Sequence, residues 1–282
     1  MTASIINKTI KSIVAASAAL IMAASVAACG PNAATPSEEN NASNGGATTS
    51  KVTARSLDEI KKSGVLKVAV FSDKAPFGYI DKDGKNAGYD IVFAERLAKD
   101  LGVKVKYTSV DPAARVDVLT SNKVDITLAN FTVTDERKAV MDFSDSYATG
   151  IQSIIVPEGS DIASPDDLAG KKIGTQRGTT GYIYCSDDFG DENVVAYDDG
   201  LTAVQALNNG QVDAVVIDNA PAQEFIAANP GLKILDTSYA EEDYAIGMAK
   251  GSSLEDAVNA ALKELKADGT LQSIVDKYIT AE

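Results

Sequence analysis

The residues best suited to binding chemistry lie at 130–137, where two threonine hydroxyls and an arginine follow a short apolar run. That run, at 124–129, is rich in β-branched residues and predicts a buried strand. The guanidinium of Arg137 offers a rigid fork of donors that matches a carboxylate, and Thr132 and Thr134 could complete such a site. Alternatively, Thr134 caps the next helix and Arg137 forms a surface ion pair. The residues alone leave both interpretations open.

Three motifs, in a fixed order, resemble one protein family. They are Pro76-Phe77-Gly78-Tyr79, Gly88-Tyr89-Asp90-Ile91 and Thr134-Asp135-Glu136-Arg137, the last followed by Asp142-Phe143-Ser144-Asp145. Each is weakly specific alone, but together they resemble the family 3 extracellular solute-binding proteins, the polar amino-acid-binding proteins of ABC importers. The likeness runs from Gly64 to the C-terminus and is strongest to the cysteine-binding and acidic-amino-acid-binding branches. It implies the type II periplasmic-binding-protein fold, in which two lobes close on one amino acid.

Composition narrows the possible functions. The chain has 282 residues, of which 45 % are apolar, so one large or two small domains can form. It has no histidine, which removes the commonest metal ligand and general base and argues against a zinc site or a Ser-His-Asp triad. A net charge of −14 argues against nucleic acid as a partner. Together with the resemblance, which implies a binding protein, we expect no catalysis, no cofactor and no metal.

The N-terminus predicts export and anchoring. Lys8 and Lys11 precede a run of small and apolar residues that is typical of a signal peptide at 1–28. Val26-Ala27-Ala28-Cys29 resembles a bacterial lipobox, which implies a lipid on Cys29 and attachment to the extracytoplasmic face of the cell membrane. The alternative is ordinary cleavage near Ala28. Residues 29–50 have almost nothing to bury and predict a flexible tether.

The second cysteine, Cys185, has no partner if Cys29 is acylated, so we expect a packed thiol and no disulfide.

Predicted strands alternate with predicted helices, which indicates an α/β fold with mostly parallel sheets. The predicted strands are 65–71, 103–107, 124–129, 151–157, 172–176, 194–197, 212–217, 232–235 and 244–249. The predicted helices are 57–62, 90–101, 113–121, one starting near 180, 202–208, 221–228, 254–266 and 271–279. The pattern starts again after Gly150. We therefore expect lobe 1 at 51–150 plus 246–282 and lobe 2 at 151–245, with crossovers near Gly150 and Tyr244.

An internal echo supports two similar lobes. Leu119-Thr120-Ser121-Asn122-Lys123-Val124-Asp125 resembles Leu207-Asn208-Asn209-Gly210-Gln211-Val212-Asp213, and an apolar strand follows each copy. A polar residue comes five positions after the shared aspartate, Asn130 in one copy and Asp218 in the other. Ligands of parallel α/β sheets bind beyond the carboxyl ends of the strands, so these residues are expected to face one cleft. Chance similarity of two helix-turn-strand units is the alternative.

The family resemblance assigns roles to the polar residues. It implies that Arg137 grips the ligand's α-carboxylate, that Thr132 and Asn130 hold its backbone atoms, and that Asp218 accepts hydrogen bonds from its α-ammonium. From lobe 2, Thr179 and Thr180 would add donors at a helix N-terminus. The alternatives are helix caps for Thr180 and Asp218.

Side-chain specificity is expected from four further residues. Arg115 matches an arginine of the acidic and cysteine-binding branches and could meet a polar side chain, or could be an exposed helix arginine. Tyr89 and Phe77 match aromatic residues that pack on the ligand in relatives, with core packing as the alternative for Tyr89. Lys74 stands near a position where some relatives carry a stacking aromatic residue.

The resemblance predicts a monomeric, lipid-anchored receptor that delivers a polar amino acid to an ABC permease. Two other functions remain open on this scaffold. One is a dehydratase-like enzyme, for which the residues offer no recognisable acid–base pair. The other is a sensory ligand-binding protein.

Overall fold

The computed structural model describes residues 53–278. Its first sheet has the strand order β5-β1-β6-β14-β7. The bounds are β1 Val65–Val70, β5 Lys104–Ser109, β6 Ile126–Thr127, β7 Met141–Phe143 and β14 Gly247–Ala249. β1 runs parallel to β5 and β6, and β14 runs antiparallel to β6 and β7. The predicted signal peptide, the predicted tether and Cys29 lie outside the described residues.

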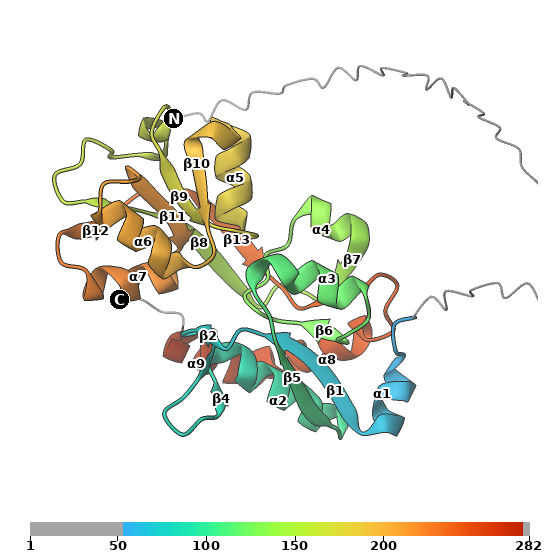
Figure 1. Cartoon of the computed structure of the whole chain (residues 1–282). Coiled ribbons are helices and arrows are strands. Elements are labelled where there is room, and N and C mark those ends of the chain that lie inside the picture. The colour runs from blue at the N-terminus through green and yellow to red at the C-terminus, as the bar shows by residue number, and fades with distance from the viewer. Residues whose placement is uncertain (1–52, 279–282) are drawn as a thin grey trace, which may run out of the picture. The chain divides into compact units, whose positions relative to one another are not determined.

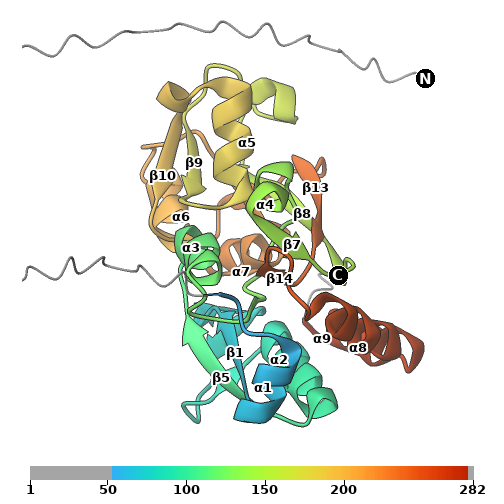
Figure 2. The same cartoon turned by 90° about the vertical axis from the view of Figure 1, so that its right-hand side faces the viewer.

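Helices cover this first sheet (Figure 1). They are α1 Leu57–Ser63, α2 Tyr89–Leu101, α3 Arg115–Thr120, α4 Asp135–Val140, α8 Glu255–Ala267 and α9 Thr270–Tyr278, with the 3₁₀ turn η1 Pro112–Ala114 before α3. α2 buries Phe93, Ala94, Leu97 and Ala98 because these residues share one face, and Gly102 ends it in the left-handed region with φ 71°. α8 and α9 pack side by side in Figure 2.

The second sheet has the order β10-β9-β11-β8-β12, and β13 also pairs with β8. The strands are β8 Ala148–Pro157, β9 Ile173–Gln176, β10 Val194–Tyr197, β11 Ala214–Asp218, β12 Leu232–Ile234 and β13 Ala240–Tyr244. The helices are α5 Thr180–Phe189, α6 Gly200–Asn208 and α7 Asn219–Ala228, with the 3₁₀ turns η2 Pro165–Leu168 and η3 Asp191–Asn193. Val215 and Ile217 pack in one apolar cluster with α6 and α7, whereas Ala214 and Val216 pack in another with α5. Strand β11 is therefore buried on both faces.

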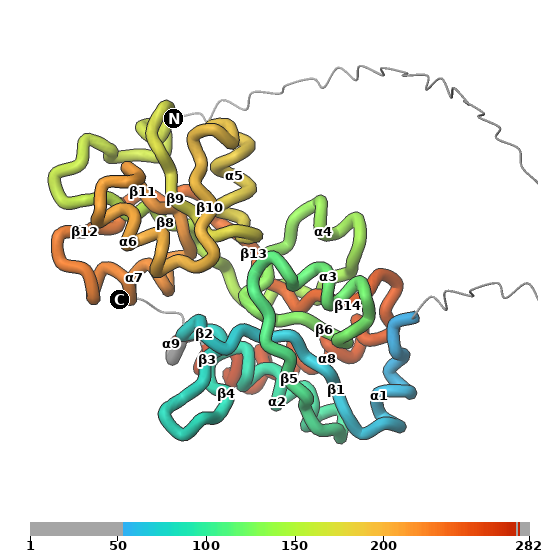
Figure 3. Tube along the Cα trace, viewed as in Figure 1, coloured from blue at the N-terminus to red at the C-terminus, as the bar shows by residue number. Residues whose placement is uncertain are grey.

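The predicted strand 244–249 is wrong, because the chain leaves one sheet and enters the other within it. β13 ends at Tyr244 in the second sheet, and β14 starts at Gly247 in the first. The other connection, between β7 and β8, runs alongside, since Tyr147 N donates to Tyr244 O at 3.0 Å. Figure 3 follows the Cα trace through these two crossings. A small sheet was also missed, formed by β2 Asp73–Lys74, β3 Gly78–Ile80 and β4 Asn86–Ala87, because no strand was predicted between 71 and 103.

The two copies of the internal echo fold in the same way. Asp125 Oδ2 accepts a hydrogen bond from Lys67 N at 2.7 Å, and Asp213 Oδ2 accepts one from Lys172 N at the same distance. The amides of the two aspartates in turn donate to the carbonyls of the same two lysines. Each aspartate thus anchors the residue just before its strand to the neighbouring parallel segment, which sets where β6 and β11 start.

Candidate functional site

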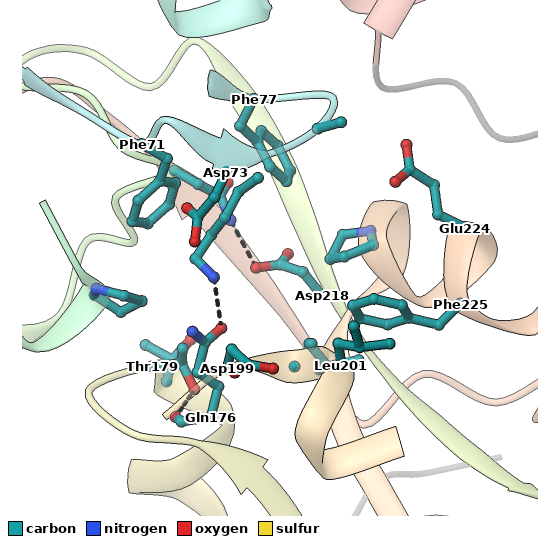
Figure 4. A pocket seen from close by; sticks show the side chains of 18 of the residues that line it. Phe71, Asp73, Phe77, Gln176, Thr179, Asp199, Leu201, Asp218, Glu224 and Phe225 are labelled. Atoms are coloured by element: carbon teal, nitrogen blue, oxygen red, sulfur yellow. Dashed lines mark hydrogen bonds between the residues drawn. The ribbon is translucent and has the colours of Figure 1, made fainter. Parts of the chain in front are cut away.

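A cavity of about 410 Å³ lies between the loops of the two sheets (Figure 4). Its size is in the range of small-molecule sites. Eight of the ten residues predicted to bind ligand line it: Lys74, Phe77, Arg115, Asn130, Thr132, Thr179, Thr180 and Asp218. Arg137 and Tyr89 do not.

The two polar residues of the internal echo meet in this cavity. Asn130 Nδ2, just beyond β6, donates to Asp218 Oδ2 at 2.7 Å, and Asp218 is the last residue of β11 (Figure 4). The side-chain amide nitrogen of Asn130 is used by this bond to the carboxylate. The side-chain oxygen, Oδ1, is buried and has no hydrogen-bond partner among the described residues. The carboxyl ends of the two strands therefore bring an acid and an acceptor to one place.

A clamp fixes the backbone next to Asn130. Ala129 and Asn130 have φ of 46° and 49°, in the left-handed region, and so end β6 earlier than the predicted strand 124–129. Asp90, fully buried, accepts from the amide of Asn130 at 3.3 Å, while Arg115 Nη1 donates to the carbonyls of Ala129 and Asn130 at 2.9 and 2.8 Å. The turn is thus held from both sides. Burial raises the pKa of Asp90 to about 8.

Arg115 is buried, so the alternative of an exposed helix arginine is wrong. Besides the two bonds from Nη1, its Nε donates to Pro112 O at 2.9 Å and its Nη2 to Gly178 O at 3.0 Å. The last bond joins the two lobes. Four of the five guanidinium N–H groups are therefore used, which leaves one on Nη2. Burial lowers the pKa of Arg115 to about 9.

Asp218 is the acidic group at the centre of the cavity. Tyr244 Oη donates to Asp218 Oδ1, and Asn130 donates to the other oxygen. Burial raises the pKa of Asp218 to about 7, an effect that these two hydrogen bonds oppose and the charge of Glu242 adds to. A cation beside this carboxyl would favour its charged form.

Arg137 lies behind the cavity wall. Its side chain is buried, its Nη1 donates to Thr132 O at 2.7 Å, and its guanidinium stacks 4.5 Å from the centroid of Phe131. These contacts contradict the alternative of a surface ion pair. Thr134 takes the capping role, because its hydroxyl accepts from Arg137 N at 3.3 Å. Thr132, which lines the cavity, separates Arg137 from it.

The second lobe contributes the N-terminus of α5. Thr179 is the N-cap, and its hydroxyl accepts from Tyr182 N at 3.4 Å and donates to Gln176 O at 2.7 Å. Thr180, the first helical residue, is buried and lines the cavity. The free amides of this first turn favour an anionic group.

The aromatic predictions divide. Phe77 lines the cavity and meets the ring of Tyr244 edge-on at 6.3 Å. Tyr89 lies in the core, with its ring centroid 5.4 Å from that of Phe93 and 5.3 Å from that of Tyr147. The structure thus gives Tyr89 the packing role that was its alternative.

Several residues of the site gave no signal in the sequence. Tyr244 reaches Asp218 because its ring lies across Gly150, where a Cβ would come within 1.9 Å of Tyr244 Cζ. Gln152 and Glu242 face each other on β8 and β13, with Gln152 Nε2 3.2 Å from Glu242 Oε2. The expected motifs contain none of these three side chains. Gln152 lines the cavity, whereas Tyr244 and Glu242 lie behind it and hydrogen-bond to the lining residues Asp218 and Thr132.

Cys185 is a buried thiol of α5, and burial raises its pKa to about 12, as expected of a packed cysteine. Within residues 53–278 no cluster of side chains suits a metal ion. No helix in that range is long and apolar enough to cross a membrane.

Two lobes of α/β structure with a ligand-sized cavity between them define a solute-binding protein, and comparisons identify the family. Residues 66–281 match the bacterial extracellular solute-binding proteins, family 3, and the chain belongs to that family. The L-cystine-binding protein TcyJ of Escherichia coli K12 is 32 % identical over 231 residues, which are 80 % of this chain and 86 % of the relative. The glutamine-binding protein GlnH of Bacillus subtilis is 31 % identical over 229 residues, covering 79 % and 84 %.

Solved structures of amino-acid-binding proteins have the same fold. The cysteine-binding protein from Campylobacter jejuni has a TM-score of 0.73 at 34 % identity and covers 79 % of this chain and 92 % of its own. The P235GK mutant of ArgBP from T. maritima has a TM-score of 0.73 at 36 % identity, covering 80 % and 99 %. The predicted family and the type II periplasmic-binding-protein fold are confirmed. The family consists of transport receptors, so the chain is a binding protein and not an enzyme.

Proposed function

We propose that this chain is the lipid-anchored, extracytoplasmic receptor of an ABC importer and that it binds a polar amino acid in the cavity between its lobes. The observation that carries the proposal is the meeting of Asn130 and Asp218 inside that cavity. An α-ammonium placed there would find one carboxylate and the free carbonyl oxygen of Asn130. It would also favour the ionised form of Asp218.

The α-carboxylate would bind on the other side of the ligand. The N-terminal turn of α5 offers amides. Arg137 supplies a positive charge beside Thr132, whose carbonyl it binds. The guanidinium of Arg137 has N–H groups beyond the one bonded to Thr132, so a small change at Thr132 would let it reach a carboxylate. Charges from different lobes would thus bind the two ends of one zwitterion, which stabilises the arrangement with both lobes in contact.

Relatives named as binding cystine, cysteine, glutamine and arginine support an amino acid as the ligand. The lobe boundaries 51–150 plus 246–282 and 151–245, the lipid on Cys29, the monomeric state and the delivery to a permease belong to the same proposal. Cys29→Ser should release the chain from the membrane fraction of cells, and a chain still sedimenting with membranes would contradict the anchor.

The test of the site is calorimetric titration with the common amino acids. Arg137→Met and Asp218→Asn should each weaken binding by at least about 100-fold, since each removes a charge-assisted contact. Arg96→Met is the matched control, because Arg96 is a surface arginine of α2 that pairs with Asp100 and Asp268. Unchanged affinity in both site variants would refute the assignment.

A further inference from the structure

Strand β13 holds two buried polar side chains behind the cavity wall. Glu242 and Tyr244 are two positions apart, so they point to the same face of the strand, and both are buried. Tyr244 donates a hydrogen bond to Asp218, the acidic group of the cavity. Glu242 contacts a different lining residue, the hydroxyl of Thr132. The strand therefore acts on two cavity-lining side chains without lining the cavity at these two positions.

One oxygen of Glu242 accepts two hydrogen bonds. Thr132 Oγ1 donates to Glu242 Oε2 at 3.1 Å, and Gln152 Nε2 donates to the same oxygen at 3.2 Å. A charged carboxylate can only accept hydrogen bonds, so the Thr132 hydroxyl turns its single proton toward Glu242. The lone pairs of the Thr132 oxygen remain. Because Thr132 lines the cavity, its hydroxyl offers the cavity an acceptor and no donor.

The backbone holds Thr132 against β13. On one side of Thr132, Val133 N donates to Asp243 O at 2.9 Å, and on the other side Ala245 N donates to Phe131 O at 3.1 Å. The Thr132 hydroxyl is therefore kept beside the carboxylate of β13 by main-chain bonds that involve no ligand. A binding group whose position is fixed in this way is preorganised.

A buried carboxylate needs a counter-charge, and Arg137 provides it. Arg137 Nη1 binds the carbonyl of Thr132, which places its guanidinium beside the residue that Glu242 also contacts. Burial lowers the pKa of Arg137, and the charge of Glu242 is the largest of the effects that raise it. The two charges thus stabilise each other behind the cavity wall.

We propose that Glu242 is a positioning residue for amino-acid binding: by accepting the proton of the Thr132 hydroxyl, it makes that oxygen an acceptor for the ligand's α-ammonium. This inference rests on the proposed function and deepens it. An ammonium group has three N–H donors. The carboxylate of Asp218, the side-chain oxygen of Asn130 and the Thr132 hydroxyl are three acceptors for them. Glu242 would supply the third of these without touching the ligand.

The experiment separates the acceptor oxygen of Glu242 from its charge. The purified full chain in detergent is titrated in a calorimeter with the common amino acids and L-cystine, and the one that wild type binds most tightly is used for all variants. Glu242→Gln and Glu242→Met both remove the charge, but only glutamine keeps an oxygen that can accept from the Thr132 hydroxyl. In Glu242→Met, an ammonium bound to Thr132 leaves the buried hydroxyl proton without an acceptor. Glu242→Met should therefore bind about 5- to 150-fold more weakly than Glu242→Gln, as expected for one unpaired buried donor.

A double-mutant cycle tests whether the effect runs through Thr132. Thr132→Val removes the hydroxyl at nearly constant shape and should weaken binding by about 10- to 150-fold, as expected for one hydrogen bond to a charged group. In the Thr132→Val background, Glu242→Met and Glu242→Gln should differ by less than about threefold, because no hydroxyl is left to orient. Glu241→Met is the matched control, since Glu241 is the exposed neighbour of Glu242 on β13, and it should bind like wild type.

Three results would overturn the inference while amino acids still bind, so that the proposed function survives. The first is equal affinity of Glu242→Met and Glu242→Gln, and the second is a difference between them that persists in Thr132→Val. The third is wild-type affinity in Thr132→Val, which needs no change at Glu242. Glu242→Leu takes the place of Glu242→Met in the cycle if the methionine variant does not fold. A folded wild type that binds none of these amino acids would remove the proposed function and this inference together.

Discussion

Gly178 is a point where backbone of the second lobe lies close to backbone of the first, and its substitution gives a sharp prediction. A Cβ built at Gly178 would lie 2.5 Å from the Cα and 2.6 Å from the N of Ala113, where ordinary contacts are 3.4–4 Å. These are backbone atoms, so Gly178→Ala must move the lobes apart here by about 1 Å. Arg115 Nη2 and Gly178 O, now 3.0 Å apart, would then be too far apart for a hydrogen bond.

The magnitude follows from that lost bond. A hydrogen bond to a charged group contributes about 1.5–3 kcal/mol, so Gly178→Ala should weaken amino-acid binding by about 10- to 150-fold. The variant also puts alanine at φ 74°, which costs about 1–2 kcal/mol of folding stability. That strain is present with and without ligand, so it should lower the unfolding temperature but not the affinity.

Gly210 separates the two effects. It has φ 67° and no atom within 4 Å of a built Cβ, so Gly210→Ala carries the same strain without the contact between lobes. Calorimetry should show wild-type affinity for Gly210→Ala, and urea unfolding should show similar destabilisation of both variants. If Gly178→Ala also binds like wild type, the lobes do not meet at this point when ligand is bound and the reasoning fails.

Two further predictions follow. Because Asp218 has a pKa of about 7 without ligand and an ammonium favours its ionised form, affinity should rise with pH from about 5.5, pass half of its plateau near pH 7 and level off roughly one pH unit higher. In Asp218→Asn the residual binding should lose this rise in calorimetric titrations at each pH, and a flat wild-type profile would contradict the role. Asp125→Ala should cost about 2–4 kcal/mol in urea unfolding and Asp213→Ala about 1 kcal/mol, because only Asp125 is buried and holds Arg55 as well as a backbone amide. Equal losses of stability in Asp125→Ala and Asp213→Ala would contradict the claim that burial makes Asp125 the more stabilising of the two.

Periodicity predicted most of the second sheet, because its strands are short apolar runs buried on both faces. It missed β13, whose sequence Ala-Glu-Glu-Asp-Tyr has no apolar alternation and is held by pairing with β8. It also extended β6 to residue 129, because the left-handed turn at Ala129 and Asn130 depends on Asp90 and Arg115, which lie far away in the sequence.

The site was predicted unevenly for a similar reason. The internal echo correctly predicted that Asn130 and Asp218 face one cleft, because the strands of two similar units end at similar places. Arg115 could not be assigned, because its burial depends on carbonyls from the turn after β6 and from Gly178 in the other lobe. Motif spacing places residues on an element, whereas their partners come from the packing of the lobes.

The most direct test of the account is thermal unfolding of the purified chain against each amino acid and L-cystine. A ligand at 1,000 times its dissociation constant stabilises the folded state by about 4 kcal/mol, which raises the unfolding temperature of a domain of this size by roughly 8–16 °C. We predict such a shift with at least one amino acid, and at the same concentration a shift of at most roughly 3–6 °C with Asp218→Asn, because a 100-fold loss of affinity leaves about 1.4 kcal/mol of stabilisation. A folded wild-type chain that shows no shift with any of them would contradict the amino-acid-binding function.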